Sequence, residues 1–186
     1  MDALQLLLQR QSATKLADPG PSAEQLDVMF QSAVRAPDHG RLRPWVFVVI
    51  PKDKRERFGE IIAQSLQRRR RDASPEMLER ERQKAMRAPT IVIAAARIKS
   101  PERIPEIEQV LSAGAAAQNI LLAANALGFG AMWRTGDAAY DDDVKTALGL
   151  LPADKIVGII YLGTDAGGAA PAGARPAAKD FVSVLG

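Results

Sequence analysis

Hydrophobic positions recur at helical spacing in several separate parts of the chain. Leu26, Met29 and Ala33 lie three or four residues apart, and this spacing predicts an amphipathic helix. Ser22 and Gln25 stand where a capping box would begin that helix. By the same reasoning, further helices are expected at 2–10, 53–70, 75–87 and 141–149, and within the uncharged stretch 109–133.

Unbroken apolar runs of strand length stand between these helices. They predict buried strands at Trp45–Ile50, Thr90–Ala96 and Lys155–Leu162, with a shorter strand at 130–134. The strands occur singly among helices, without the regular strand–helix alternation of a doubly wound sheet. This order predicts an α+β fold in which helices flank a small sheet. Because the chain shows no internal repeat and no linker, one domain is expected over residues 1–186.

The longest apolar segment, 109–133, contains no charged residue and is weighed first as a membrane helix. Gln118, Asn119 and Asn125 would each lack a partner in lipid, and Gly128–Gly130 interrupts the run. A helix of a soluble protein, buried on nearly every side, is therefore expected instead of a membrane span. The small side chains at 112–117 would let another helix approach closely, as in the middle of a large helical interface.

The C-terminal segment 165–186 is rich in Ala, Gly and Pro and ends in the apolar residues Phe181–Leu185. Most of it has too few large side chains to pack against a core of its own. Two interpretations stay open, namely extension along a neighbouring subunit and disorder.

The composition leaves few options for catalysis by side chains. The absence of cysteine excludes disulfides, thiolate metal sites and cysteine nucleophiles. His39 is the one histidine, and the chain has neither a Gly-x-Ser-x-Gly elbow nor a histidine-based metal motif, so no metal site is expected. The N-terminus lacks the basic region and cleavage site of a secretory signal, which makes the cytoplasm the expected location.

The net charge of +3 arises from one segment of the chain. Residues 52–87 contain 12 Lys and Arg against 7 Asp and Glu, and include the run Arg68–Arg71. Phe58 is the one aromatic residue there, whereas sites for single-stranded nucleic acid place aromatic rings among the cations. Solvated helices with ion pairs are the preferred interpretation, and nucleic acid is not expected as a partner. The alternative is a non-enzymatic module that binds nucleic acid or an acidic partner.

What remains is a set of binding groups without reacting groups, as expected when a cofactor carries the chemistry. Arg10-Gln11-Ser12 ends the first predicted helix. A guanidinium pairs bidentately with a phosphate, and the nearby hydroxyl can add a hydrogen bond. Taken alone, Arg-x-Ser at a helix end is also typical of a surface cap.

Together with three later segments, these residues resemble the nitroreductase family of flavoproteins, in its compact NAD(P)H nitroreductase branch. The four segments are Arg10–Ser12, the turn Ala36–Trp45, Asn125–Trp133 and Lys155–Gly163, and they follow the family's order. The resemblance implies a nitroreductase-like fold with a mainly antiparallel sheet and an intertwined homodimer, the C-terminal tail lying on the partner. It also implies FMN as cofactor and NAD(P)H as electron donor. Hydride would pass through flavin N5 to a nitroaromatic, quinone or similar acceptor in a ping-pong reaction.

The resemblance further assigns the site residues. Those implied to bind FMN are Arg10, Gln11, Ser12, Ala131, Met132 and Trp133 of one subunit, with Arg35 and His39 of its partner. Those implied to meet NAD(P) are Leu121, Leu122, Ala123, Ala124, Asn125 and Ala126, although their apolar character equally fits packing. No residue is assigned as an obligatory acid or base. For His39, a loop histidine with its hydrogen bonds satisfied is the alternative.

The chain also departs from the family's pattern. Asp38, Arg41 and Arg43 stand where the family has Ser, Asn and Gln, which leaves the usual amide contacts to the flavin pyrimidine edge open. Lys15 lies one place late for a second phosphate cation of some members. An arginine near flavin N1 and O2 would suit the negative charge of the reduced ring. A different reaction within the family, such as reductive dehalogenation or flavin breakdown, is the alternative function.

Overall fold

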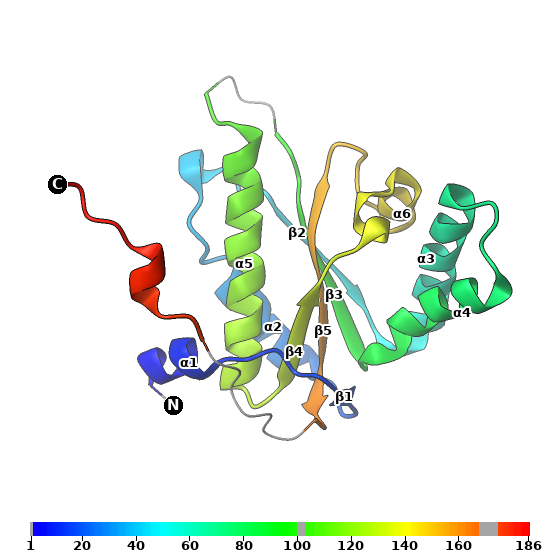
Figure 1. Ribbon diagram of the computed structural model, residues 1–186, viewed down its shortest axis with the longest axis horizontal. Helices are drawn as coiled ribbons and strands as arrows, with labels where there is room; N and C mark the ends of the chain where they lie inside the picture. The colour runs from blue at the N-terminus through cyan, green and yellow to red at the C-terminus, as the bar shows by residue number, and fades with distance from the viewer. Residues whose placement is uncertain (1, 100–102, 168–174) are drawn as a thin grey trace.

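The computed structural model describes residues 2–99, 103–167 and 175–186 (Figure 1). Its helices are α1 (Ala3–Gln9), α2 (Ala23–Ala33), α3 (Arg55–Arg69), α4 (Pro75–Lys84), α5 (Glu106–Ala126) and α6 (Asp142–Ala147). Its strands are β1 (Leu16–Ala17), β2 (Trp45–Ile50), β3 (Thr90–Ala96), β4 (Gly130–Arg134) and β5 (Lys155–Asp165). Each helix and strand expected from the sequence is present. Strand β1 was not expected.

All strand pairings in the sheet are antiparallel, which confirms the predicted α+β class. Strand β5 is the central strand, because β3 and β4 both pair with its middle part and must therefore lie on opposite sides of it. β2 follows β3 outward, and the two-residue β1 pairs with the end of β5. A strand with neighbours on both edges is shielded from water, and residues Ile156 and Gly158–Gly163 of β5 are buried.

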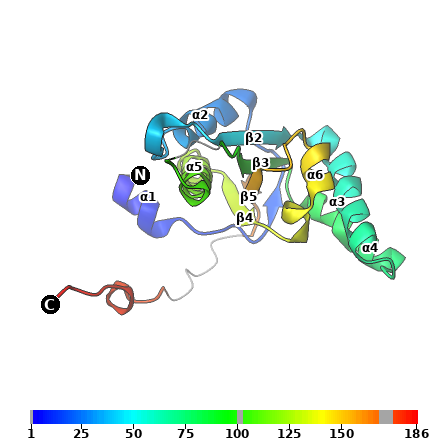
Figure 2. The same ribbon diagram turned by 90° about the horizontal axis from the view of Figure 1, so that it is seen from above.

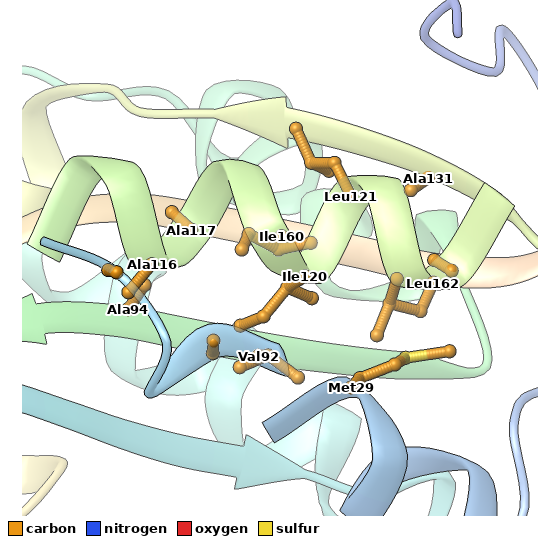
Figure 3. Packing of buried hydrophobic residues seen from close by; sticks show 13 residues of the cluster. Met29, Val92, Ala94, Ala116, Ala117, Ile120, Leu121, Ala131, Ile160 and Leu162 are labelled. Carbon is orange, nitrogen blue, oxygen red and sulfur yellow. The ribbon is translucent and has the colours of Figure 1, made fainter. Parts of the chain in front are cut away.

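Alternating side chains of the sheet build two hydrophobic cores, one on each face. Val92 of β3 and Leu162 of β5 face α2 and α5, where Figure 3 shows them packed with Met29 and Ile120. On the other face α3 covers the sheet through Phe58 and Ile62, and α4 and α6 pack against α3. Figure 2 shows the sheet between these two groups of helices. This alternation follows from the two-residue repeat of a strand.

Helix α5 departs from the expectation of burial on nearly every side. Its sheet-facing side is fully buried, with Ala116 and Ile120 at 0% exposure, but Leu111 is 64% exposed. The uncharged sequence had suggested a helix enclosed on nearly every side. Among the described residues, no helix combines the length and the apolar character needed to cross a membrane.

Helix α1 and the C-terminal segment 175–186 carry seven of the fifteen exposed large apolar side chains of the described residues. Leu4 and Leu8 are 70% and 79% exposed, and Phe181 and Leu185 are 76% and 99% exposed. Figures 1 and 2 show the C-terminal segment running away from the body of the chain, on the side of α1. Part of the predicted tail, 168–174, lies outside the described residues. Large apolar side chains that gather on one part of the surface, rather than standing singly, are typical of a surface that another chain covers.

Candidate functional site

The segment Arg10-Gln11-Ser12 links α1 to the sheet. The Arg10 backbone N–H donates to the Leu6 carbonyl and closes α1. Directly after the segment, the Ala13 N–H donates to the Ala131 carbonyl of β4 over 2.9 Å. The structure therefore brings together two of the predicted FMN segments, residues 10–12 and 131–133, which lie far apart in the sequence.

The Arg10 guanidinium has an unsatisfied donor. Its Nη1 atom is buried and has no hydrogen-bond partner among the described residues. A buried donor left unpaired costs about 1–3 kcal/mol, which a bound acceptor would offset. Arg175 brings a second guanidinium to the same segment, since its Nη2 donates to the backbone carbonyl of Arg10 over 3.2 Å. Ser12 is exposed next to them. Two guanidiniums and a hydroxyl are groups that bind a phosphate well, so the residues present fit a phosphorylated ligand.

The three predicted residues of β4 divide between the two faces of the sheet. Ala131 and Trp133 face α5, whereas Met132 faces α3. The Trp133 indole Nε1 donates to the Val157 carbonyl over 3.0 Å, which makes this side chain a core residue. The backbone remains available for binding. Because the Ala131 carbonyl points away from β5 toward Ala13, the N–H and carbonyl of Trp133 point toward the same outer edge.

On the α3 face of the sheet, Met132 borders a cavity of about 340 Å³ that begins at Ala13, directly after the Arg10 segment. A second cavity of about 250 Å³ adjoins it, and the two share Arg87, Arg134 and Tyr161 as lining residues. We call the pair the joined cavity. It extends from the N-terminal segment along β4 toward α3, and its walls come from segments that are distant in the sequence.

Unpaired positive charge accumulates in the joined cavity. Lys84 pairs there with Glu81, and Arg69 pairs with Asp137 at 2.8 Å. In the described part of the chain, Arg87 and Arg134 form no ion pair. The joined cavity therefore favours an anionic group.

Tyr161 is 3% exposed at the junction of the two halves of the joined cavity. Burial raises the pKa of its phenol, although the nearby Arg87 and Arg134 oppose that shift. The phenol therefore stays protonated at neutral pH and can donate a hydrogen bond.

Sequence reasoning did not name Arg87, Arg134 or Tyr161. Tyr161 and Arg134 lie within predicted strands, and residues 159–161 of β5 pair with 132–134 of β4. The alternation of side chains along paired strands would have placed Met132, Arg134 and Tyr161 on one face. Nothing in the sequence distinguished Arg87 from the other eleven cations of the basic segment 52–87.

The turn that holds His39 lies at the other end of α5. His39 Nδ1 is 2.5 Å from Glu108 Oε2, in the first turn of that helix. The Ala124 carbonyl, near the helix end, binds Phe129 just before β4. The seventeen residues from Glu108 to Ala124 span about 24 Å of helix. Arg35 is exposed directly after α2. Within one chain, the structure does not bring Arg35 and His39 to the joined cavity.

Asp38, Arg41 and Arg43 take defined places in that turn. The Asp38 carboxylate accepts hydrogen bonds from the backbone N–H groups of Leu42 and Arg43, at 3.2 and 2.7 Å. Arg41 and Arg43 have positive φ angles of 55° and 50°, and both side chains are exposed. Asp38 thus stabilises an unusual backbone, a role that the Ser of the family's turn would fill less strongly. A flavin contact by Arg41 or Arg43 stays open.

The segment predicted for NAD(P), 121–126, forms the last part of α5. Leu121 and Ala124 are 3% and 0% exposed within the core, so their side chains do not reach the surface. Leu122, Ala123 and Asn125 are half-buried and Ala126 is exposed. A nucleotide contact by 121–126 stays a prediction. It would have to be made by the side chains of these four residues, which are not fully buried. Within the described ranges, no group of three or more acidic or histidine side chains could hold a metal ion.

Comparison with known proteins agrees with this arrangement. The sequence model of the Nitroreductase family matches residues 7–164. The chain belongs to the nitroreductase family. It is 40% identical to "Putative NAD(P)H nitroreductase YdjA" of Escherichia coli K12 over 164 residues, which are 88% of each chain.

Two solved structures share the nitroreductase fold. One is a nitroreductase-like family protein from Bacillus cereus, with a TM-score of 0.84 and 22% identity over 100% of this chain and 96% of that one. The other is a "putative nitroreductase in complex with FMN" from Desulfovibrio desulfuricans, with a TM-score of 0.75 and 26% identity over 100% and 98%. The predicted nitroreductase-like fold is thereby confirmed.

Proposed function

We propose that the protein is an FMN-dependent oxidoreductase that takes electrons from NAD(P)H. The observation that carries this proposal is the buried, unpartnered Nη1 of Arg10, three residues before Ala13, which lines a positively charged cavity. Family membership supports it, as do the names of relatives, which refer to NAD(P)H nitroreductases and to bound FMN. One terminal phosphate matches the Arg10 site, whereas no site for an adenosine extension was recognised.

The residues of the chain would divide the binding of FMN among them. Arg10, Arg175 and Ser12 would hold the phosphate, with Gln11 adding contacts of its backbone. The outer edge of β4, at Ala131–Trp133, would offer backbone hydrogen bonds to the polar side of the ring. Arg87, Arg134 and the Tyr161 hydroxyl would face the part of the ring that becomes negative on reduction.

When bound, FMN supplies two-electron chemistry at N5, between NAD(P)H as donor and a nitroaromatic, quinone or similar acceptor. Donor and acceptor would use the joined cavity in turn beside the cofactor, which would give ping-pong kinetics. No side chain is assigned as an acid or base. The cytoplasmic location expected from the sequence stays a prediction.

We further propose a homodimer whose subunits share each flavin site. The exposed leucines of α1 and the extended C-terminal segment offer apolar surface for a second copy. Arg35 and His39 lie toward the opposite end of α5 from Arg10 in the same chain, so they would serve the flavin held by the partner. A twofold axis would give two such sites for each dimer.

The absorption spectrum of the purified protein tests the cofactor. Protein prepared without added flavin should be yellow, and heating should release FMN rather than FAD. Arg10→Ala should reduce the bound FMN at least tenfold, because charge-assisted hydrogen bonds to phosphate are lost. The matched control is Arg57→Ala, which removes an exposed arginine from α3 and should leave FMN content unchanged. A colourless protein that also fails to bind added FMN would contradict the proposal.

A further inference from the structure

The backbone around His39 is held by contacts that do not involve its imidazole. Ser112 of α5 donates to the Pro37 carbonyl over 2.6 Å and accepts from the Trp45 indole N–H over 2.9 Å. The Asp38 carboxylate binds two backbone N–H groups of the same turn. Lys99 Nζ donates to the Leu42 carbonyl over 2.5 Å. These contacts therefore fix the path of the turn from both sides without any contribution from the histidine ring.

The orientation of the ring depends on Glu108 alone among the described residues. Glu108 Oε2 lies 2.5 Å from His39 Nδ1, while the two side chains are 41% and 63% exposed. A carboxylate only accepts hydrogen bonds, so Nδ1 is the donor of this contact and Nε2 is the nitrogen left for another partner. Of the other charged groups around the turn, Asp38 and Lys99 are engaged with backbone, and Arg41 and Arg43 are exposed.

A surface hollow of about 330 Å³ lies beside this pair. Leu111 and Ala115 of α5 give it an apolar wall, and His39 and Glu108 give it a polar rim. This combination suits a group that is partly aromatic and partly polar. In the proposed dimer, the flavin held by the partner subunit is such a group.

We infer that Glu108 is a positioning residue that fixes the His39 imidazole with Nε2 directed at the flavin of the partner subunit. The inference rests on the proposed FMN function and on the shared site. Glu108 borders the same hollow, but the inference assigns it no hydrogen bond to the cofactor. It acts by holding one ring orientation and one protonated nitrogen, in the way that a carboxylate orients a functional histidine in many sites.

Titration of apoprotein with FMN, followed by quenching of flavin fluorescence, tests which nitrogen matters. The terminal amide of glutamine can reach the place of Nε2 and present its oxygen as an acceptor there, whereas the shorter amide of asparagine reaches only the place of Nδ1. His39→Ala should weaken FMN binding about tenfold, the effect of one lost hydrogen bond. His39→Gln should bind within about threefold of wild type, and His39→Asn as weakly as His39→Ala. Equal binding by the Gln and Asn variants overturns the inference.

Variants of Glu108 test whether it acts through His39. Glu108→Ala should weaken FMN binding about fivefold, whereas Glu108→Gln keeps an acceptor oxygen and should stay close to wild type. In the double variant with His39→Ala, loss of Glu108 should add nothing, because the two residues form one unit. Glu106→Ala is the matched control. Glu106 lies two residues before Glu108 in the same turn of α5, but it pairs with Lys155 at 3.4 Å instead of with His39.

The outcomes separate the inference from the function on which it rests. Wild-type apoprotein that does not bind FMN contradicts the proposed function, and with it the inference. Wild type that binds FMN while Glu108→Ala binds equally well, or losses that multiply in the double variant, overturn the inference alone. If Glu108→Ala fails to fold by circular dichroism, the comparison of His39→Gln with His39→Asn decides.

Discussion

The indole of Trp133 lies directly against Gly158, and the packing depends on the missing side chain of the glycine. A Cβ atom built at Gly158 would stand 2.5 Å from the indole Nε1, well inside van der Waals contact. The same Nε1 donates to the Val157 carbonyl one residue earlier. Gly158 thus allows β4 and β5 to be joined by a side chain as well as by their backbones. The outer edge of β4, where the candidate flavin contacts lie, depends on this junction.

We predict that Gly158→Ala destabilises the protein by about 1–3 kcal/mol, because the indole must move and its hydrogen bond is strained. Urea unfolding followed by far-ultraviolet circular dichroism, at equal protein concentration, measures the loss. Gly114→Ala is the control, since a Cβ there meets the same indole from α5 at an ordinary 4.0 Å. It should be neutral or stabilising by up to about 1 kcal/mol. Equal stability of the two variants would show that the Gly158 contact is unimportant.

The helices and main strands were predictable because their signals are local. The capping box at Ser22 and Gln25 forms as expected, and β2 begins and ends at the predicted residues. The two-residue β1 was not predictable, since it exists only through its pairing with the end of β5. The exposure of Leu111 on α5 was also missed, because an uncharged sequence cannot show which side of a helix the same chain leaves uncovered.

The candidate site was predictable only in part. The motif Arg10-Gln11-Ser12 could be found from the sequence, and the structure adds that Arg10 has a buried donor without a partner. The cationic wall could not be found, because Arg87 and Arg134 come together with Tyr161 only through the pairing of β4 with β5 and the packing of α3. The pairing of His39 with Glu108 joins residues 69 positions apart, and no local pattern indicates it.

Asp141 should make the stability depend on pH. Its side chain is 10% exposed and caps α6, accepting hydrogen bonds from Ser65 and from the backbone of Asp143 and Val144. Burial alone would raise the pKa of this carboxyl, but these hydrogen bonds and the charge of Arg68 outweigh it and lower the pKa. A lowered pKa in the folded state adds stability above the pKa of the unfolded chain. That contribution is lost as the pH falls through the folded value.

We therefore predict that Asp141→Asn keeps the helix cap but removes the charge. At pH 7 the variant should be less stable than wild type by about 1–2 kcal/mol, and the difference should shrink toward pH 3. Urea unfolding at both pH values measures this, with Asp53→Asn as a control at an exposed carboxylate. A difference that stays the same at pH 7 and pH 3 would exclude a contribution from the Asp141 charge.

The basic segment should not bind nucleic acid. Three of its four consecutive arginines pair with acids, namely Arg68 with Asp143 at 2.7 Å, Arg69 with Asp137 at 2.8 Å, and Arg70 with Asp72 at 3.3 Å. These ion pairs partly compensate the positive charge of the arginines within the protein itself. Fluorescence anisotropy near physiological salt should show no binding of micromolar strength to single- or double-stranded oligonucleotides. Micromolar binding that disappears when Arg68–Arg71 are replaced by serine would establish the alternative function.

A shared flavin site makes a prediction that a site within one subunit does not make. Arg10→Ala and His39→Ala each impair FMN binding, but in different halves of the shared site. When the two variants are co-expressed with different tags and purified through both, every dimer contains one copy of each. One site of such a dimer then carries both defects, while the other combines an intact Arg10 with an intact His39. About half of the sites should therefore bind FMN tightly and reduce an acceptor, by the symmetry of a twofold dimer.

The alternative arrangement gives a different result in the same sample. If Arg10 and His39 contacted the same subunit's flavin, every site of the mixed dimer would keep one defect, and neither tight binding nor activity would return. Each variant purified alone supplies the baseline, and the two tags show that mixed dimers have formed. The pair Arg10→Ala and Arg87→Ala is the matched control, because the Arg10 segment leads directly into Ala13, which lines the joined cavity together with Arg87 of the same chain. That pair should show no recovery, since each site of its mixed dimer retains one of the two losses.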